Sequence, residues 1–251
     1  MRRHRRASTI VAVVAGAVGL AACGSEPDQS STTTALPQGS EAVELDPADF
    51  TTSIDNPFWP MAPGDRWAYR ESNPGEPVQR VVVEVTDRTR TMPNGVEARI
   101  VTDVVAARGE PVEVTHDFYA QDQDGNVWYL GERTAEYRHG EVATRAGSFE
   151  AGANGAQAGI AIPADPADGM AYRQEYLKGE AEDEGEVLSI DEQVEVPTGH
   201  YTGALMTRDT NPLEPKVSEL KFYARDVGPV LTLSVSGGSG REELVSYSGG
   251  G

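Results

Sequence analysis

The chain has 251 residues, enough for one large or two small domains with a hydrophobic core, and its single cysteine excludes an intramolecular disulfide framework. Its 40 acidic residues outnumber its 21 basic residues, so the formal net charge is −19. Because this charge repels the phosphates of nucleic acids and anionic lipids, we expect neither nucleic acid nor an anionic lipid surface as a partner.

The first 23 residues combine a basic start with a short apolar stretch. Four arginines lie within residues 2–6, and an apolar run follows from Ile10 to Ala22, which is the order of a secretory signal peptide. The run is shorter than the roughly 20 apolar residues of a spanning helix. It ends in Leu20-Ala21-Ala22-Cys23, which resembles the lipobox of bacterial lipoproteins. The resemblance implies cleavage before Cys23 and acylation of its thiol, with fatty acids such as palmitate.

These features predict a signal peptide over residues 1–22 and a protein held by lipid at the extracytoplasmic face of the cell membrane. Cleavage would remove four arginines and no acids, leaving 17 basic and 40 acidic residues and a formal charge of −23. The arginine pair at residues 2–3 leaves both the general secretory route and the twin-arginine route open. The sequence also leaves open which membrane holds the lipid, where a cell has two, and the oligomeric state.

Residues 23–55 are predicted to form the lipidated cysteine and a disordered tether, because serine, threonine, proline and acids dominate there. A chain of about 30 such residues has a mean reach of about 30 Å. The folded domain is expected over residues 56–247, and residues 248–251 are expected to form a flexible tail.

Within the predicted domain, apolar residues recur at every second position. Val81 to Val85, Val112 to Phe118 and Leu188 to Val196 show this period, which is typical of antiparallel strands with one wet face. Turn pairs such as Arg108-Gly109 and His139-Gly140 separate the strands. We therefore predict an all-β fold with few or no helices. Its strands would follow one another in a single antiparallel meander, as a curved sheet or a partly open barrel.

Three segments resemble a family of uncharacterised secreted bacterial β-rich proteins and lipoproteins. They are the "P-G-x-x-W-x-Y" strand at Pro63 to Tyr69, the "D-G-N-V-W-Y-L-G-E" hairpin at Asp124 to Glu132, and the "Y-A-x-x-V-G-x-V" strand at Tyr223 to Val230. The last segment departs from the commoner family pattern at Arg225-Asp226 and at Pro229. The resemblance implies a β architecture and no established activity, so it supplies no catalytic residues.

No catalytic motif occurs in residues 23–251: there is no G-x-S-x-G, H-E-x-x-H, P-loop or dinucleotide-binding glycine pattern. We therefore predict no cofactor, and the sequence favours a non-enzymatic protein without excluding catalysis. Forty acids offer many carboxylate pairs of the kind that hydrolyse glycosides, but nothing in the sequence singles one out.

Four residues are predicted to line a ligand pocket: His116, Phe118, Trp67 and Trp128. The period of two places His116 on the face of Val112, Val114 and Phe118, where it would be desolvated, with a pKa below 6.5. A shift of one residue would instead turn His116 outward and Asp117 inward. The tryptophans lie near predicted strand starts, where aromatic side chains commonly close a β core.

An acidic run at residues 179–186 offers oxygen ligands and flexible glycines, as Ca²⁺ prefers, although the spacing is not that of an EF-hand. No metal site is predicted with assurance. The weak calcium candidates are Glu180, Glu182, Asp183 and Glu184.

Together these observations predict a non-catalytic, membrane-anchored module that binds an apolar small molecule, a lipid or an envelope partner. Two alternatives remain open. One is a structural or interaction domain without a pocket. The other is a carboxylate-dependent hydrolase of envelope polymers, which a converging pair of buried acids in a cleft would favour.

The lipobox generates a direct test. Replacing Cys23 with Ala removes the acylated thiol, and with it about 0.8 kcal/mol of membrane affinity for each buried CH₂ of the lipid chains. The variant is expected in the soluble fraction or as an unprocessed precursor when detergent-phase partitioning is measured. Partitioning identical to that of the wild type would contradict lipid attachment at Cys23.

Overall fold

The computed structural model describes residues 35–250. The predicted signal peptide (1–22), Cys23 and residues 24–34 of the predicted tether lie outside the described residues, as does Gly251. Within residues 35–250, no helix has the length and apolarity needed to span a bilayer.

The described residues form strands from one end to the other. In chain order these are β1 (Phe50–Thr51), β2 (Arg66–Ser72), β3 (Gln79–Thr91), β4 (Glu97–Ala107), β5 (Glu110–Asp122), β6 (Val127–Arg138), β7 (Glu141–Thr144), β8 (Phe149–Glu150), β9 (Gln157–Ile162), β10 (Ala171–Arg173), β11 (Glu175–Tyr176), β12 (Glu184–Val196), β13 (Gly199–Thr210), β14 (Ser218–Ala224), β15 (Gly228–Ser236) and β16 (Arg241–Ser248). A single 3₁₀ turn, η1 (Pro47–Asp49), is the helical element of residues 35–250.

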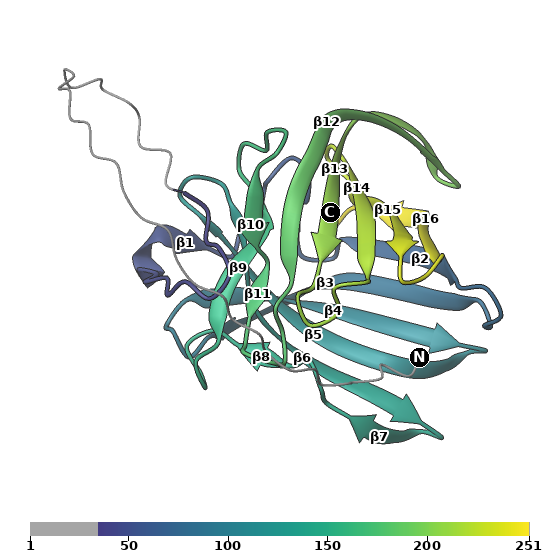
Figure 1. Cartoon of the computed structure of the whole chain (residues 1–251), viewed down its shortest axis with the longest axis horizontal. Helices are drawn as coiled ribbons and strands as arrows, with labels where there is room; N and C mark the ends of the chain where they lie inside the picture. Colours follow the sequence, from purple (N-terminus) through teal and green to yellow (C-terminus); the bar gives the residue numbers. More distant parts are fainter. Residues whose placement is uncertain (1–34, 251) are drawn as a thin grey trace, which may run out of the picture. The chain divides into compact units, whose positions relative to one another are not determined.

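One antiparallel sheet contains these strands. Thirteen of them lie in the order β10-β12-β13-β14-β15-β16-β2-β3-β4-β5-β6-β9-β11, while β1 pairs with β5, and β7 and β8 pair with β6. In Figure 1, β3 to β6 run side by side as long strands (blue to teal), and β12 to β15 (green to yellow) stand across them. Most neighbours in the sheet are consecutive in the chain, and β16 pairs with β2 to join its two halves. The predicted all-β meander, curved into a nearly closed barrel, is confirmed.

The predicted hairpins form as expected because their turn residues adopt the left-handed conformation. Arg108 and Gly109 have φ values of 54° and 86°, and His139 and Gly140 have values of 54° and 78°. Two consecutive positive φ angles are the signature of the tight turn that matches the twist of an antiparallel pair. These turns join β4 to β5 and β6 to β7, so the hairpin signals in the sequence set the register there.

A six-residue segment, 171–176, closes the sheet. Its first half, β10, pairs with β12, and its second half, β11, pairs with β9 at the other end of the strand order. Arg173, the last residue of β10, is 1 % exposed, and its guanidinium group donates to the Ala158 carbonyl of β9 at 2.7 and 3.1 Å. One short segment therefore connects both ends of the sheet.

A glycine in β12 makes room for this closure. Tyr172 lies opposite Gly185, and a Cβ atom at Gly185 would come within 2.6 Å of the tyrosine ring. The ring therefore lies flat against the backbone of β12 and is 1 % exposed. Its hydroxyl oxygen is buried without a hydrogen-bond partner.

The ordered part of the chain begins earlier than residue 56, where the sequence places the start of the domain. The backbone N–H of Arg173 donates to the Pro37 carbonyl at 2.7 Å, and its guanidinium group donates to the carbonyls of Gly39 and Glu41 at 2.8 and 2.6 Å. The predicted tether through residue 55 therefore does not describe residues 35–55. The polar composition of residues 35–55 suggested disorder because it says nothing about backbone contacts. Backbone carbonyl groups, which every residue has, accept these hydrogen bonds.

Backbone contacts also order the end of the described chain and the segment before β9. Gly250 donates its backbone N–H to the Asp65 carboxylate at 2.6 Å, so the predicted flexible tail is bound to the domain at that residue. Residues 151–159, which are rich in small side chains, form a turn that leads into β9 from Gln157. Small side chains suit this strand because the backbone of Arg173 and Gln174 passes closely over Gly159.

Residues 54–65 contribute Ile54, Phe58 and Met61 to the apolar core, which also contains Trp67 of β2. Trp67 is 1 % exposed and stacks on Tyr247 with ring centroids 5.4 Å apart. Asn56, at the predicted domain start, is buried and donates to the carbonyls of Gly125 and Pro163 at 3.0 and 3.1 Å. These bonds join the chain before β2 to the loops beyond β5 and β9, which closes this end of the fold.

The role of Arg173 can be tested by Arg173→Met. The change leaves the carbonyls of Ala158, Gly39 and Glu41 without their donor, so we expect a loss of about 2–4 kcal/mol in the free energy of unfolding. Limited proteolysis should also become faster within residues 35–45. Arg66→Met is the matched control: Arg66 is 40 % exposed and 3.8 Å from Glu84, so its loss should cost less than about 1 kcal/mol. Equal effects of the two substitutions would contradict the closing role of Arg173.

Candidate functional site: an acidic recess inside the sheet

Polar side chains line the inner face of strands β4, β5 and β6. Asp103 of β4 lies opposite Thr115 of β5, which lies opposite Thr134 of β6. Two residues further along β5, Asp117 lies opposite Glu132. Directly opposed residues share one face of a sheet, so these five side chains point the same way. The exposed fractions of Thr115 and Asp117 are 6 % and 9 %, which places this face inside the fold.

The inner face continues across the other half of the sheet. Lys221 of β14 lies opposite Thr207 of β13 and Thr232 of β15, and Thr232 lies opposite Glu242 of β16. Charge interactions connect the two halves, since Glu242 acts on Asp103. We call this region the inner recess. It is defined by Asp103, Asp117, Glu132, Glu175, Lys221 and Glu242.

The recess is accessible to water. Lys221 keeps 33 % of its side-chain surface accessible. Asp103, Glu132, Glu175 and Glu242 are likewise half-buried rather than sealed. Water can therefore reach part of this inner face.

Asp103 is the least compensated group of the recess. Its Oδ1 atom is buried and has no hydrogen-bond partner. Burial raises the pKa of Asp103 well above its usual value, and the negative charges of Asp117 and Glu242 raise it further. A buried carboxylate without a donor is unfavourable, because it loses its hydration and gains no interaction in return.

Asp117 and Glu132 share a single hydroxyl group. The Tyr129 hydroxyl lies 2.7 Å from Oδ1 of Asp117 and 2.9 Å from Oε2 of Glu132. A tyrosine hydroxyl carries one hydrogen, so it donates to one carboxylate, and the second contact needs a hydrogen from the acid itself. Burial and the charge of Glu132 raise the pKa of Asp117 to about 7, against the opposing effect of the Tyr129 hydrogen bond. The pair therefore holds a proton near neutral pH.

Lys221 already has a partner. Its Nζ atom lies 2.7 Å from Oδ2 of Asp209, and the Thr207 hydroxyl donates to the other oxygen of Asp209 at 2.9 Å. Burial opposes the charged form of Lys221, but Asp209 and the neighbouring Tyr223 outweigh it, so the pKa of Lys221 is raised. The lysine is held as a cation by Asp209, and little of its charge compensates the other acids.

Glu242 and Glu175 add to the negative charge. Burial, followed by the charge of Glu71, raises the pKa of Glu242 to about 7. Burial also raises the pKa of Glu175, and Asp183 and Glu132 raise it further. Lys221 acts in the opposite direction on both groups, but their pKa values stay raised. The recess as a whole contains more negative charge than its lysine can balance.

His116 lies on the opposite, outer face of β5, so the prediction of an inward His116 is wrong. Its Nδ1 atom is 3.2 Å from the Thr102 hydroxyl. Partial burial lowers the pKa of His116, and the charges of Arg88 and Arg133 lower it further. The pKa of His116 is therefore lowered, as predicted. Part of the lowering, however, comes from arginines on the outer face of the sheet and not from burial inside it. The inner face instead belongs to Asp117, the arrangement expected from a shift of one residue.

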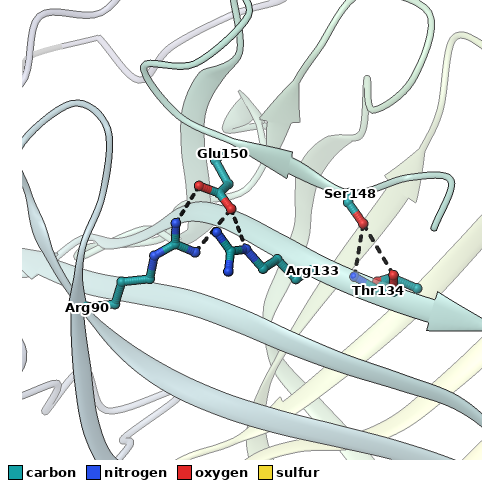
Figure 2. Close-up of polar contacts among 5 residues, drawn as sticks. All are labelled: Arg90, Arg133, Thr134, Ser148 and Glu150. Atoms are coloured by element: carbon teal, nitrogen blue, oxygen red, sulfur yellow. Dashed lines mark hydrogen bonds and ion pairs between the residues drawn. The ribbon is translucent and has the colours of Figure 1, made fainter.

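Phe118 shares the outer face with His116. The guanidinium group of Arg90 covers its ring at 4.8 Å, which keeps Phe118 only 2 % exposed. Figure 2 shows Arg90 and Arg133 both directed at Glu150, with contacts of 2.6 and 2.5 Å. Burial disfavours the Glu150 carboxylate, but the two arginines outweigh it and lower its pKa. On this outer face, the acid Glu150 is thus paired with two arginines, unlike the acids of the inner recess.

The two predicted tryptophans contact different parts of the core. The Trp67 indole donates to the Val227 carbonyl at 2.6 Å, beside its stacking partner Tyr247. The Trp128 indole donates to Asp122 at 2.7 Å and meets the edge of Phe50. Both indole N–H groups are therefore used within the core. The structure does not bring Trp67, Trp128, His116 and Phe118 to one place, so the predicted pocket is not formed by these four.

The weak calcium candidates do not form a metal site. In residues 35–250 no group of three or more His, Cys, Asp or Glu side chains is arranged to hold a metal ion. Glu182 accepts the backbone N–H of Gly179 at 2.7 Å, and Asp183 accepts the Asn211 amide. Glu180 is exposed, and Glu184 begins β12. Hydrogen bonds of this kind to neighbouring protein groups hold the acidic run in its turn.

Sequence reasoning missed the recess because it assigned the polar positions of β5 to a solvent-facing surface. Thr115, Asp117 and Tyr119 alternate with His116 and Phe118, and either set could be the inner one. One signal was present: the two neighbouring strands carry acids, with Asp103 in register with Thr115 and Glu132 in register with Asp117. Only the pairing of the strands makes that register visible.

Chemically, the recess can accept hydrogen bonds and positive charge. It offers several carboxylates, a proton shared near Tyr129, and the buried hydroxyl of Tyr172, which lies near Asp209 and Lys221. Among the described residues it contains no arrangement suited to a metal ion. A solute with hydrogen-bond donors suits this lining better than a purely apolar one.

Comparisons with known proteins add little to this geometry. No protein-family model matches the chain, and no curated protein matches it either. A solved structure, that of a putative lipoprotein from Parabacteroides distasonis ATCC 8503, matches with 13 % identity and a TM-score of 0.41. The match covers 76 % of this chain and 98 % of that one. A likeness this distant carries no argument about function, and the resemblance to secreted β-rich proteins stays a prediction.

The raised pKa of Asp117 predicts a specific pH dependence of stability. The folded state keeps the Asp117 proton up to pH about 7, whereas the unfolded state releases it near pH 4. Stability due to this group is therefore complete below pH 4 and is lost as the pH rises to about 7. Asp117→Asn removes this dependence. We expect urea denaturation to show the variant more stable than wild type by about 2 kcal/mol at pH 8, and equal to it near pH 4.

The matched control for this experiment is Asp124→Asn, which removes the same charge at an exposed hairpin turn. Its stability should follow that of the wild type within about 0.5 kcal/mol at every pH. A less stable Asp117→Asn variant at pH 8 would show that the Asp117 carboxylate is compensated in the folded state, contrary to the geometry described above.

Proposed function

We propose that this chain is a lipid-anchored extracytoplasmic protein whose β domain binds a small polar ligand in the inner recess, without catalysing a reaction. The lipobox at Leu20 to Cys23 supports the lipid anchor. The gathering of carboxylates on the inner face of the sheet, with a buried oxygen of Asp103 that has no hydrogen-bond partner, is the observation that carries the binding function.

The proposed ligand differs from the apolar molecule or lipid that the sequence predicts. An apolar ligand would cover Asp103, Glu132 and Glu242 without offering them a donor, and burying unpaired charge is costly. A polar ligand supplies hydrogen bonds and removes that cost. The structural alternative, an interaction domain without a pocket, gives no reason for carboxylates to gather inside the sheet.

The converging acids Asp117 and Glu132 raise a second candidate, a carboxylate-dependent hydrolase. Hydrolysis of a glycoside by two carboxyl groups requires the scissile bond to lie between them. The Tyr129 hydroxyl occupies that position and contacts both carboxyl groups. The pair is therefore arranged to hold a proton within the protein rather than to act on a bound sugar, and binding is the favoured function.

The proposed function can be tested by native mass spectrometry of the protein purified in detergent from its own host. We expect the mass of the acylated chain beginning at Cys23, together with a second species heavier by the mass of one small molecule. Asp103→Asn should reduce the fraction of this second species, whereas Asp124→Asn should leave it unchanged. A single unliganded species in wild type, with no stabilisation by any of a panel of small polar molecules, would contradict the binding function.

A further inference from the structure

The turn between β8 and β9 contains an asparagine that is placed for a spontaneous covalent change. We propose that Asn154 is a deamidation site, at which water converts the side-chain amide to a carboxylate without an enzyme. Asparagine is one of the chemically labile residues of proteins, and its surroundings decide how fast it reacts. The proposal rests on the residue that follows each asparagine, on the hydrogen bonds of two backbone N–H groups, and on exposure. It is independent of the proposed binding function.

The reaction joins the side chain of Asn154 to the next residue. The backbone nitrogen of Gly155 loses its proton and attacks Cγ of Asn154; a C–N bond forms, and Nδ2 leaves as ammonia. Water then opens the cyclic imide. Breaking the new bond to Cγ gives aspartate, whereas breaking the original peptide bond gives isoaspartate, whose main chain runs through Cβ and Cγ. The sum is water consumed and ammonia released, with no change of oxidation state.

The residue after each asparagine decides whether this attack can occur. The chain has six asparagines, and three of them precede proline: Asn56, Asn73 and Asn211. The proline nitrogen has no hydrogen to lose, so these three cannot form the imide in this way. Asn126 precedes a valine, whose branched side chain crowds the attacking nitrogen. Glycine leaves the nitrogen open, and it follows Asn94 and Asn154 alone.

Hydrogen bonds hold both reacting groups of the Asn94-Gly95 pair. The N–H of Gly95 donates to the Met92 carbonyl at 2.8 Å, and Oδ1 of Asn94 accepts the N–H of Val96 at 3.2 Å. The surroundings also restrict rotation, because a Cβ atom at Gly152 would lie 2.6 Å from the backbone nitrogen of Asn94. Attack at Asn94 therefore requires two hydrogen bonds to break in a closely packed turn.

The Asn154-Gly155 pair is free of such contacts. The turn is closed by the N–H of Ala156, which donates to the Ala153 carbonyl at 2.9 Å and so spans the pair without using its reacting groups. Within residues 35–250, neither the N–H of Gly155 nor the side chain of Asn154 has a hydrogen-bond partner. Both residues are exposed, and nothing lies within 4 Å of a Cβ atom placed at Gly155.

The backbone conformation of Asn154 also favours movement. Its φ angle is 54°, in the left-handed region, which is less stable than the right-handed one for a residue with a Cβ atom. Attack requires rotation about the Cα–C bond of Asn154, so the turn must leave this conformation. The rotation meets no side-chain contact and costs little packing. Among the asparagines of residues 35–250, the geometry therefore singles out Asn154.

The isoaspartate product would alter the turn. It adds an atom to the main chain within a two-residue turn, whose length fits the two flanking positions. The bond from Ala156 to Ala153 and the bond from the Gly152 N–H to the Ala156 carbonyl, at 3.1 Å, both span the insertion. We expect both bonds to weaken and limited proteolysis to become faster within residues 151–157.

The test is prolonged incubation of the full-length protein in detergent at 37 °C, in parallel at pH 6 and pH 8.5, followed by digestion with trypsin and mass spectrometry. Trypsin places the two Asn-Gly pairs on separate peptides, residues 91–99 and 146–173. We expect residue 154 to deamidate at least fivefold faster than residue 94. The rate should be higher at pH 8.5, because the attacking nitrogen must lose its proton.

Two controls assign this difference to the fold and to the site. In the chain unfolded by guanidinium chloride, the rates at residues 94 and 154 should agree within twofold, because both pairs then have the same local sequence, Asn-Gly. Asn154→Gln should abolish the mass change of peptide 146–173 and the faster proteolysis of aged protein.

Three results would overturn the proposal. The first is an equal or faster reaction at residue 94 in the folded protein. The second is an unchanged residue 154 in the folded protein over a time in which the unfolded chain reacts to completion. The third is the same ratio of the two rates in the folded and unfolded chains, which would assign the difference to sequence and not to the turn.

Discussion

Closure of the sheet through residues 171–176 is the constraint from which the other features follow. An open sheet has two solvated or covered faces, whereas a closed one has an inside. β10 and β11 pair with opposite ends of the strand order, and Arg173 binds the carbonyls of β9 and of the N-terminal segment. Alternate residues of every strand are thereby directed inward, and the acids among them are gathered in one enclosed space.

The distribution of charge across the wall is the second feature of the fold. On the outer side, Glu150 is bound by Arg90 and Arg133, and its pKa is lowered. On the inner side, Asp103 and Asp117 face other acids, and their pKa values are raised. Arginines of β3 and β6 therefore compensate an acid on the outer face, whereas the inner acids of β4 and β5 face other acids. Buried acids without a partner reduce the stability of the fold, and this cost supports the proposed binding function.

Much of the fold could be predicted from the sequence, because alternation and turn pairs are local signals. The strands around Val81, Val114 and Val194 and the turns at Gly109 and Gly140 lie where the pattern places them. The candidate site could not be predicted in the same way. A period of two defines two faces without saying which one is inside, and the apolar residues of β5 indicated the wrong one.

The missing information was long-range. Phe118 is buried on the outer face because Arg90, from another strand, covers it. Asp117 is buried on the inner face because β14 and β16 complete the enclosure. The order of residues 35–55 likewise depends on Arg173, more than 130 positions later in the chain. These contacts join residues that lie far apart in the chain, so they produce no periodic pattern in the sequence.

The central claim is that the recess contains carboxylates that lack compensating charge. It is tested most directly by nuclear magnetic resonance titration of the side-chain carboxyl carbons, with Asp103 and Asp117 assigned through their Asn variants. The account predicts that both groups titrate well above the usual value near 4, with Asp117 near pH 7. Titration of both groups below pH 4.5 would show that their charges are compensated in the folded protein, and would contradict the account.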